Sequence, residues 1–166
     1  EVDQDYCKDE KIILNIVKGG TTATKFIWAN GHQETSNEKY EVTNVQIGDN
    51  QFDIVGVKEY VQDNTSKKCY DTTTISTKVY ALPEIKIDGP AFICKETVTK
   101  LSAKDVSGNG TLANTYTWSP NPTDVETTVE NGVTVSTIEV PAPTTEYTTY
   151  TAQGSFETAG GKTCSS

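Results

Sequence analysis

The chain has 166 residues, contains no arginine, and carries a net charge of −9 from 14 lysines against 23 aspartates and glutamates. This acidic balance and the scattered lysines argue against a nucleic-acid surface, which needs clustered basic side chains to grip phosphates. No run of 18 apolar residues exists, so the sequence predicts no direct membrane insertion.

Alternating polar and apolar residues, rich in Thr and Val, predict β-strands along the chain and no amphipathic helix. In chain order, the first predicted strands span 11–17, 24–29, 40–47, 51–61 and 70–82. A second series spans 84–87, 97–103, 114–119, 133–140 and 146–156. Turn residues separate these runs, among them GG at 19–20, NG at 30–31, GDN at 48–50, SGNG at 107–110 and NG at 131–132.

The order Cys–Trp–Cys occurs twice, and corresponding residues are offset by 87, 90 and 95 positions. The two sets are Cys7, Trp28 and Cys69, followed by Cys94, Trp118 and Cys164. Self-similarity at a nearly fixed offset indicates tandem modules, and a spacing near 90 residues suits one small β-sandwich per unit. We therefore expect an all-β chain of two tandem immunoglobulin-like β-sandwich domains, 1–82 and 83–166, with the boundary near Leu82–Pro83.

The cysteines allow more than one interpretation. No CxxC pair occurs and His32 is the single histidine, so we expect no metal site and no cofactor. Disulfides would require an oxidising compartment. The plainer alternative is that all four are buried free thiols, because free Cys is often a core residue.

Unit two carries the pattern GPAFICKETVTKLSA, TYTWSPNP, TTEYTTYTAQGSF and GGKTC. This pattern resembles the tandem immunoglobulin-like or PKD-like modules of large secreted surface proteins of Bacteroidetes. Unit two matches from Pro83 to Cys164, and unit one matches more weakly through Cys7, FIWANG, QFDIVGV and Cys69. The FIWANG segment departs from the WxFGDG of typical PKD modules. The resemblance implies a multidomain adhesin or cell-surface protein.

In the frame of that resemblance, bridges Cys7–Cys69 and Cys94–Cys164 would each pin one end of a sandwich, although four cysteines allow three connectivities. Trp28 and Trp118 would each fill the space between two sheets as core aromatics. The competing interpretation is a sugar-binding platform. Its aromatic residues would be Phe26, Trp28, Tyr40, Tyr60 and Tyr70 in unit one, and Tyr116, Trp118, Tyr147 and Tyr150 in unit two.

Support for enzymatic chemistry is thin. A Ser-His-Asp arrangement would have to use His32, and no GxSxG occurs. The carboxylate pairs Asp9–Glu10 and Glu34–Glu38 would need a fixed separation across a cleft to act as glycosidase acids. A calcium site could draw on Asp49, Asp53, Asp71 and Asp105, but no D-x-D-x-D-G loop is present, so solvated surface charge is the better interpretation.

We therefore expect no enzyme, but an extracellular structural or adhesive module pair of a larger secreted or cell-surface protein. Its partners would be a protein or glycan ligand and neighbouring modules. The alternative is a carbohydrate-binding module appended to a secreted enzyme. Unit one also has little chain before its first Cys and unit two little after its second, which suggests excision from a longer array or strand exchange with a neighbour.

Overall fold

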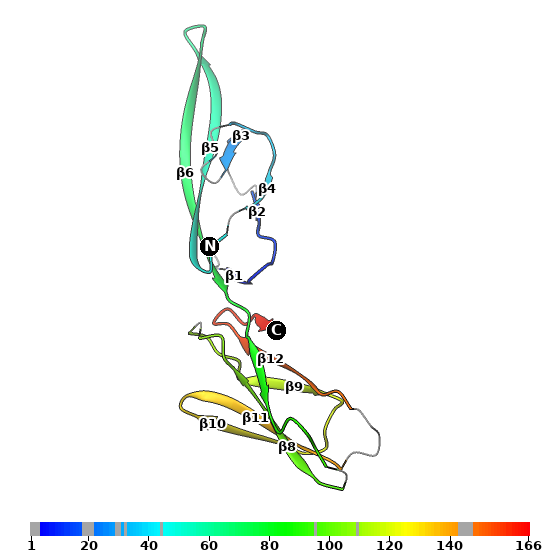
Figure 1. Cartoon of the computed structure of the whole chain (residues 1–166). Coiled ribbons are helices and arrows are strands. Elements are labelled where there is room, and N and C mark those ends of the chain that lie inside the picture. The colour runs from blue at the N-terminus through cyan, green and yellow to red at the C-terminus, as the bar shows by residue number, and fades with distance from the viewer. Residues whose placement is uncertain are drawn as a thin grey trace. The chain divides into compact units, whose positions relative to one another are not determined.

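The computed structural model describes residues 4–17, 22–28, 31, 33–43, 45–94, 96–108, 110–142 and 148–166. These residues form strands β1 to β13 and no helix, so the chain is all-β (Figure 1). No helix in the described part of the chain could cross a membrane. The chain divides into two compact units, Glu1–Tyr80 and Ala81–Ser166, where the sequence placed the boundary at Leu82–Pro83.

Unit one contains two sheets. The larger has the order β1-β6-β5-β3, from strands Gln4–Cys7, Thr65–Tyr80, Gly48–Gln62 and Lys25–Trp28. The smaller pairs β2 (Ile13–Asn15) with β4 (Lys39–Glu41). β1 runs parallel to β6, and the other pairs are antiparallel.

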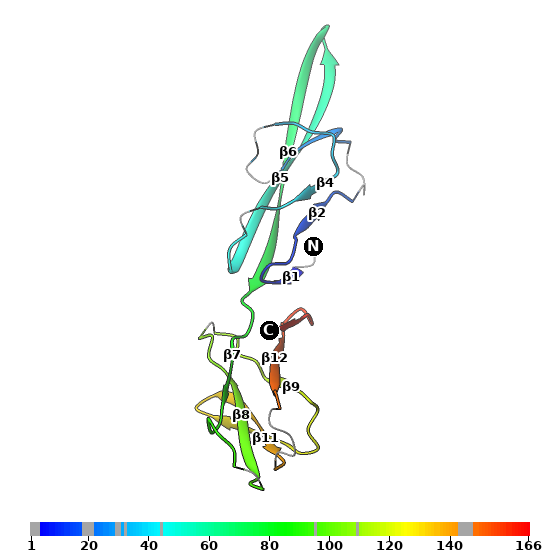
Figure 2. The same cartoon turned by 45° about the vertical axis from the view of Figure 1, so that its right-hand side comes forward.

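A long hairpin dominates unit one. β5 and β6 pair along their whole lengths, from Gly48 opposite Val79 to Gln62 opposite Thr65. Asp63 and Asn64 join them with φ values of 53° and 58°, which are the positive angles of the two-residue turn that matches strand twist. β3 pairs only with residues 54–57 and β1 only with 77–80, so the hairpin end extends past both neighbours (Figures 1 and 2).

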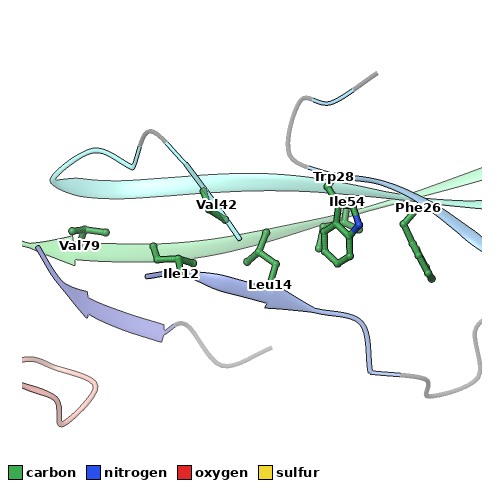
Figure 3. Close-up of a cluster of buried hydrophobic side chains, with 7 residues drawn as sticks. All are labelled: Ile12, Leu14, Phe26, Trp28, Val42, Ile54 and Val79. Atoms are coloured by element: carbon green, nitrogen blue, oxygen red, sulfur yellow. The ribbon is translucent and has the colours of Figure 1, made fainter. Parts of the chain in front are cut away.

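The core of unit one lies between its two sheets. Trp28 and Phe26 project from β3 and Ile54 from β5 toward Leu14 and Ile12 on the β2 side (Figure 3). Trp28 is 4% exposed, donates its indole N–H to the carbonyl of Asn37 at 3.0 Å, and stacks on Tyr40. A buried indole with a satisfied N–H is a core aromatic, which is the role that the resemblance implies for Trp28.

Unit two also has two sheets. One has the order β10-β11-β8-β7, from strands Val125–Glu130, Val133–Val140, Thr99–Asp105 and Ile85–Asp88. The other has the order β13-β12-β9, from strands Thr163–Ser165, Thr151–Glu157 and Thr115–Ser119. All pairs in both sheets are antiparallel.

The two sheets of unit two share one core, an arrangement consistent with a β-sandwich. Trp118 on β9 is 6% exposed and packs with Ala103 and Ile138 of the other sheet. Its indole N–H donates to the hydroxyl of Ser136 at 3.0 Å. Trp118 thus links the two layers by packing and by a hydrogen bond.

Several predicted boundaries are wrong. The GDN turn at 48–50 is instead the start of β5, because Gly48 pairs directly with Val79. Residues 62 and 65–69, left outside the predicted strands, extend the hairpin. β10 was also missed because all its residues are exposed and carry no apolar alternation; its pairing with β11 through the Asn131–Gly132 turn forms it.

Candidate interaction surface on the projecting hairpin

The end of the β5–β6 hairpin is the most exposed structured part of unit one. We call residues 58–70 the projecting hairpin. All of its described strand residues are exposed, on both faces of the two-stranded ribbon. Isolated two-stranded ribbons are marginally stable, so this one depends on the sheet at its base and on side-chain contacts along its faces.

One face of the hairpin base carries a lattice of four charges over a buried valine. Lys25 contacts Glu59 at 2.9 Å and Lys68 contacts Glu34 at 2.7 Å. Each lysine also contacts the other glutamate, Lys25 reaching Glu34 at 3.9 Å and Lys68 reaching Glu59 at 3.5 Å. The four side chains therefore form a closed network. Val57, between β3 and β6 at this level, is fully buried. The lattice ties the hairpin base to β3 and to the segment holding Glu34.

The lattice shifts the pKa values of Glu59 and Lys68 in the direction that keeps both charged. The Lys25 ammonium holds the pKa of Glu59 below its usual value, with a smaller contribution from Lys68. The hydrogen bond that the Lys68 ammonium donates to the Glu34 carboxylate raises the pKa of Lys68. Both side chains are solvent-exposed, so their contribution to stability is small and weakened by salt.

The opposite face of the hairpin base opens into a pocket of about 760 Å³. Its apolar lining includes Phe26, Ile54 and Ile75, and its polar lining includes Lys58, Cys69 and Asp71. Apolar walls with a few polar groups are typical of sites that take extended chains or small ligands. The described lining residues include one cysteine and no histidine, so no Cys–His pair lies among them.

The aromatic residues do not form a common platform. Tyr60 and Tyr70 are exposed by 38% and 58%, but they point to opposite faces of the ribbon. Tyr60 stands opposite Lys67 and Tyr70 opposite Val57, and successive residues alternate between faces. The other candidates pack on or in the cores, namely Phe26, Trp28, Tyr40, Tyr116, Trp118 and Tyr150. Tyr147 lies outside the described residues.

The β6 edge of the hairpin offers the longer run of unpaired backbone groups toward the turn, since the β5 edge is uncovered there only beyond Val57. β1 covers β6 only at residues 77–80, and no other described strand pairs with that edge. The carbonyl of Val57 accepts the Thr24 N–H, so the backbone groups of Val57 point toward β3. Val57 and Tyr70 are therefore a non-hydrogen-bonded pair, and the N–H and C=O of Tyr70 point away from β5. The outward set on β6 is therefore Ser66, Lys68, Tyr70 and Thr72.

The expected pairings Cys7–Cys69 and Cys94–Cys164 are wrong. Cys69 and Cys94 are exposed free thiols, whereas Cys7 and Cys164 are buried and in disulfide linkage. Cys7 stands opposite Tyr80, and Cys69 lies eleven residues before Tyr80 on β6, about 36 Å away. A disulfide needs α-carbons within about 7 Å.

The two cysteines of the second predicted pair lie toward opposite ends of β8. Cys164 stands opposite Phe156 on β12. Two residues earlier on β12, Gly154 packs against Ile85, which pairs with Asp105 at the end of β8. Cys94 precedes Thr99, which begins β8 at its other end. The seven residues of β8 alone span about 20 Å.

The carboxylates considered for calcium do not converge. Asp105 is 3% exposed and accepts backbone N–H groups from Ser107 and Ala113 at 2.8 Å and from Glu84 at 3.2 Å. Burial alone would raise the pKa of Asp105, but these donors outweigh it and hold the pKa below the usual value. Asp53 accepts from the Thr74 hydroxyl at 2.6 Å. Asp49 and Asp71 are exposed on β5 and β6.

The remaining catalytic candidates are also separate. Glu10 accepts the N–H of Cys7 at 2.7 Å next to Asp9, and Glu34 belongs to the charge lattice with Lys68. Among the described residues, no group of three His, Cys, Asp or Glu side chains could hold a metal ion. His32 lies outside the described residues.

No protein-family model matches the chain, and no curated protein sequence matches it significantly.

Proposed function

We propose that the chain is a pair of immunoglobulin-like modules of a larger exported or cell-surface protein, acting as spacer and interaction domains in cell adhesion. The strand orders of unit two support this. With β7 to β13 taken as A, B, C, D, E, F and G, the sheets become ABED and CFG, the orders of a constant-type immunoglobulin domain.

Unit one supports the same proposal through its shared elements. β3, β5 and β6 pair in the order of strands C, F and G, and β2 pairs with β4 as B pairs with E. The buried tryptophan of β3 occupies the place of the strand-C tryptophan. Two small sandwich modules with no converging catalytic groups among the described residues suit a role in spacing and binding.

The projecting hairpin is the observation that carries the interaction role. The projecting hairpin is exposed on both faces, so its described strand residues contribute nothing to the core of unit one. Val61 is 74% exposed near its turn and Tyr70 is 58% exposed nearer its base, so the ribbon presents apolar and aromatic side chains to a partner. We propose that this ribbon is the contact element of the module pair.

Bead attachment tests the proposal. Beads coated with the full chain are washed over glass that carries mucin or fibronectin, representing glycoprotein and matrix surfaces. We expect retention on at least one surface, and a several-fold loss of retention when residues 59–68 are replaced by Asn-Gly. This replacement preserves the turn, because Lys58 and Cys69 form a pair of the same type as Gln62 and Thr65.

Matched point variants separate a local contact from general stickiness. Val61→Asp on the projecting hairpin and Val129→Asp on β10 change valines of similar exposure, 74% and 70%. Only Val61→Asp should reduce retention. Equal loss from both variants, or no retention of the wild-type beads on either surface, would contradict the proposed contact.

A glycan array distinguishes the carbohydrate-binding alternative. Binding to a defined sugar that is lost in Tyr60→Ala or Tyr70→Ala would favour a carbohydrate-binding module. Because these two rings point to opposite faces, we expect no such binding.

A further inference from the structure

The open edge of β6 is complementary to itself. We propose that two copies of the chain pair edge to edge through residues 65–73 of β6, antiparallel, with Cys69 opposite Cys69 of the second copy. This inference goes beyond the proposed function and does not depend on it, since the partner is the chain itself.

The backbone pattern selects this register. The pairs β5 makes with Lys67, Cys69 and Asp71 are the hydrogen-bonded ones, so the N–H and C=O groups of these residues are used within the chain. The outward groups of Ser66, Lys68, Tyr70 and Thr72 are free to bond a second strand. In the proposed register Ser66 meets Thr72 and Lys68 meets Tyr70 of the other copy, so outward groups meet outward groups.

The side chains favour the same register. Lys67 of each copy stands opposite Asp71 of the other, which places two opposite-charge pairs on the face that carries Cys69. On the other face Lys68 stands opposite Tyr70, whose ring is 58% exposed in the single copy. Thr65 and Ser66 stand opposite Thr73 and Thr72, and such hydroxyl pairs are stabilising across strands.

The register also fits within the free length of the edge. β1 begins to cover β6 at Thr77, four residues beyond Thr73. In this register Thr73 of one copy stands opposite Thr65, the first residue of β6 in the other copy. The second copy turns back at Asp63–Asn64 before it reaches the level of Thr77, so it does not meet β1. The β2–β4 sheet packs on the face of β5–β6 and not on this edge.

The cysteine pairing follows from the backbone pattern. Cys69 occupies a non-hydrogen-bonded position between the two copies, where facing α-carbons lie about 4.5 Å apart. That separation lies in the range a disulfide requires. The Cys69 thiols of the two copies can therefore form one disulfide bond. They lose two protons and two electrons to a disulfide oxidant such as oxidised glutathione, which becomes two molecules of reduced glutathione.

The test is oxidation of the full chain with oxidised glutathione, followed by non-reducing electrophoresis and peptide mapping. Cleavage after lysine releases Cys69 in the peptide Cys69–Lys78, so the proposed bridge gives that peptide linked to itself. Cys94 is the matched control, because it is the other exposed free thiol among the described residues. We expect Cys69–Cys69 links to exceed Cys69–Cys94 and Cys94–Cys94 links about tenfold, since random collision would give comparable yields.

Charge reversal and rescue test the register without disturbing the core. Asp71→Lys places lysines opposite each other in both pairs and should lower the yield of Cys69–Cys69 links about tenfold. The double variant Lys67→Asp with Asp71→Lys restores opposite charges and should restore the yield.

Three results would overturn the proposal: comparable yields of all thiol pairs, insensitivity to Asp71→Lys, or failure of the double variant to recover. A chain that remains monomeric in light scattering at high concentration and forms no links would do the same. That outcome would assign the edge to another occupant, such as a strand of a different protein.

Discussion

Removal of the Asp105 carboxylate should destabilise unit two more than any exposed acidic substitution. The carboxylate is 3% exposed and accepts three backbone N–H groups, from Glu84, Ser107 and Ala113. These donors belong to segments on both sides of β8, so one side chain organises this end of the unit. Asp105→Ala leaves the donors without their acceptor.

The magnitude follows from the number of orphaned donors. Each buried donor left without a partner costs about 1–3 kcal/mol, and entering water or loop movement recovers part of it. We therefore expect Asp105→Ala to lower the free energy of unfolding by about 3–5 kcal/mol. For a unit of this size that is a fall of at least about 12 °C in Tm.

The pH dependence has a defined sign. Because the folded pKa of Asp105 lies below its unfolded value of about 3.9, the carboxylate contributes its full stability above that value. The contribution is lost as pH falls through the folded pKa. The difference between wild type and Asp105→Ala should therefore be constant near neutral pH and shrink in acid.

Guanidinium unfolding of the full chain, followed by tryptophan fluorescence, measures both effects. Asp124→Ala, the same change at an exposed position of unit two, is the control and should be nearly neutral. A loss below about 1 kcal/mol, or a loss of equal size at every pH, would refute the role assigned to Asp105.

Three further predictions concern the cores and the thiols. Gly154→Ala should lower the stability of unit two by about 1–3 kcal/mol, because a Cβ there would lie 2.3 Å from Cδ1 of Ile85; adding Ile85→Val should recover part of the loss. Trp118→Phe should cost about 1–3 kcal/mol in the same denaturation assay, through lost volume and the broken bond to Ser136; a neutral result would contradict its place in the core. Maleimide labelling of the native chain, mapped by mass spectrometry, should modify Cys69 and Cys94 and spare Cys7 and Cys164; a mapped bridge containing Cys69 or Cys94 in the monomer would contradict this assignment.

The sequence identifies elements whose pattern is local. In 115–119 the alternation of side chains matches the sheet faces, and the repeat marks both tryptophans as core residues. In 133–140 the pattern predicts the strand but not its faces, because Val135 and Ile138 are buried on opposite faces. Trp28 and Trp118 are predictable because a bulky apolar side chain amid strand residues has few places other than the interior.

The rest depends on pairing partners distant in the chain. The projecting hairpin was missed because Asp63–Asn64 lacks the glycine of the commonest two-residue turns, although both residues tolerate positive φ. The disulfide pairing was wrong because equal spacing in sequence says nothing of position along a strand, and the 16-residue β6 carries Cys69 far from Cys7. Asp105 was read as surface charge because its three donors come from loops that no local pattern aligns.

Residue-resolved hydrogen exchange along β6 tests the central claim most directly, namely that the projecting hairpin is a formed ribbon whose β6 edge is free. In dilute solution the amides of Lys67, Cys69, Asp71 and Thr73 should be protected by β5, while those of Ser66, Lys68, Tyr70 and Thr72 exchange rapidly. In concentrated solution the second set should become protected as copies pair. Uniformly rapid exchange of all eight amides would contradict the ribbon, and protection of the second set in dilute monomer would contradict the free edge.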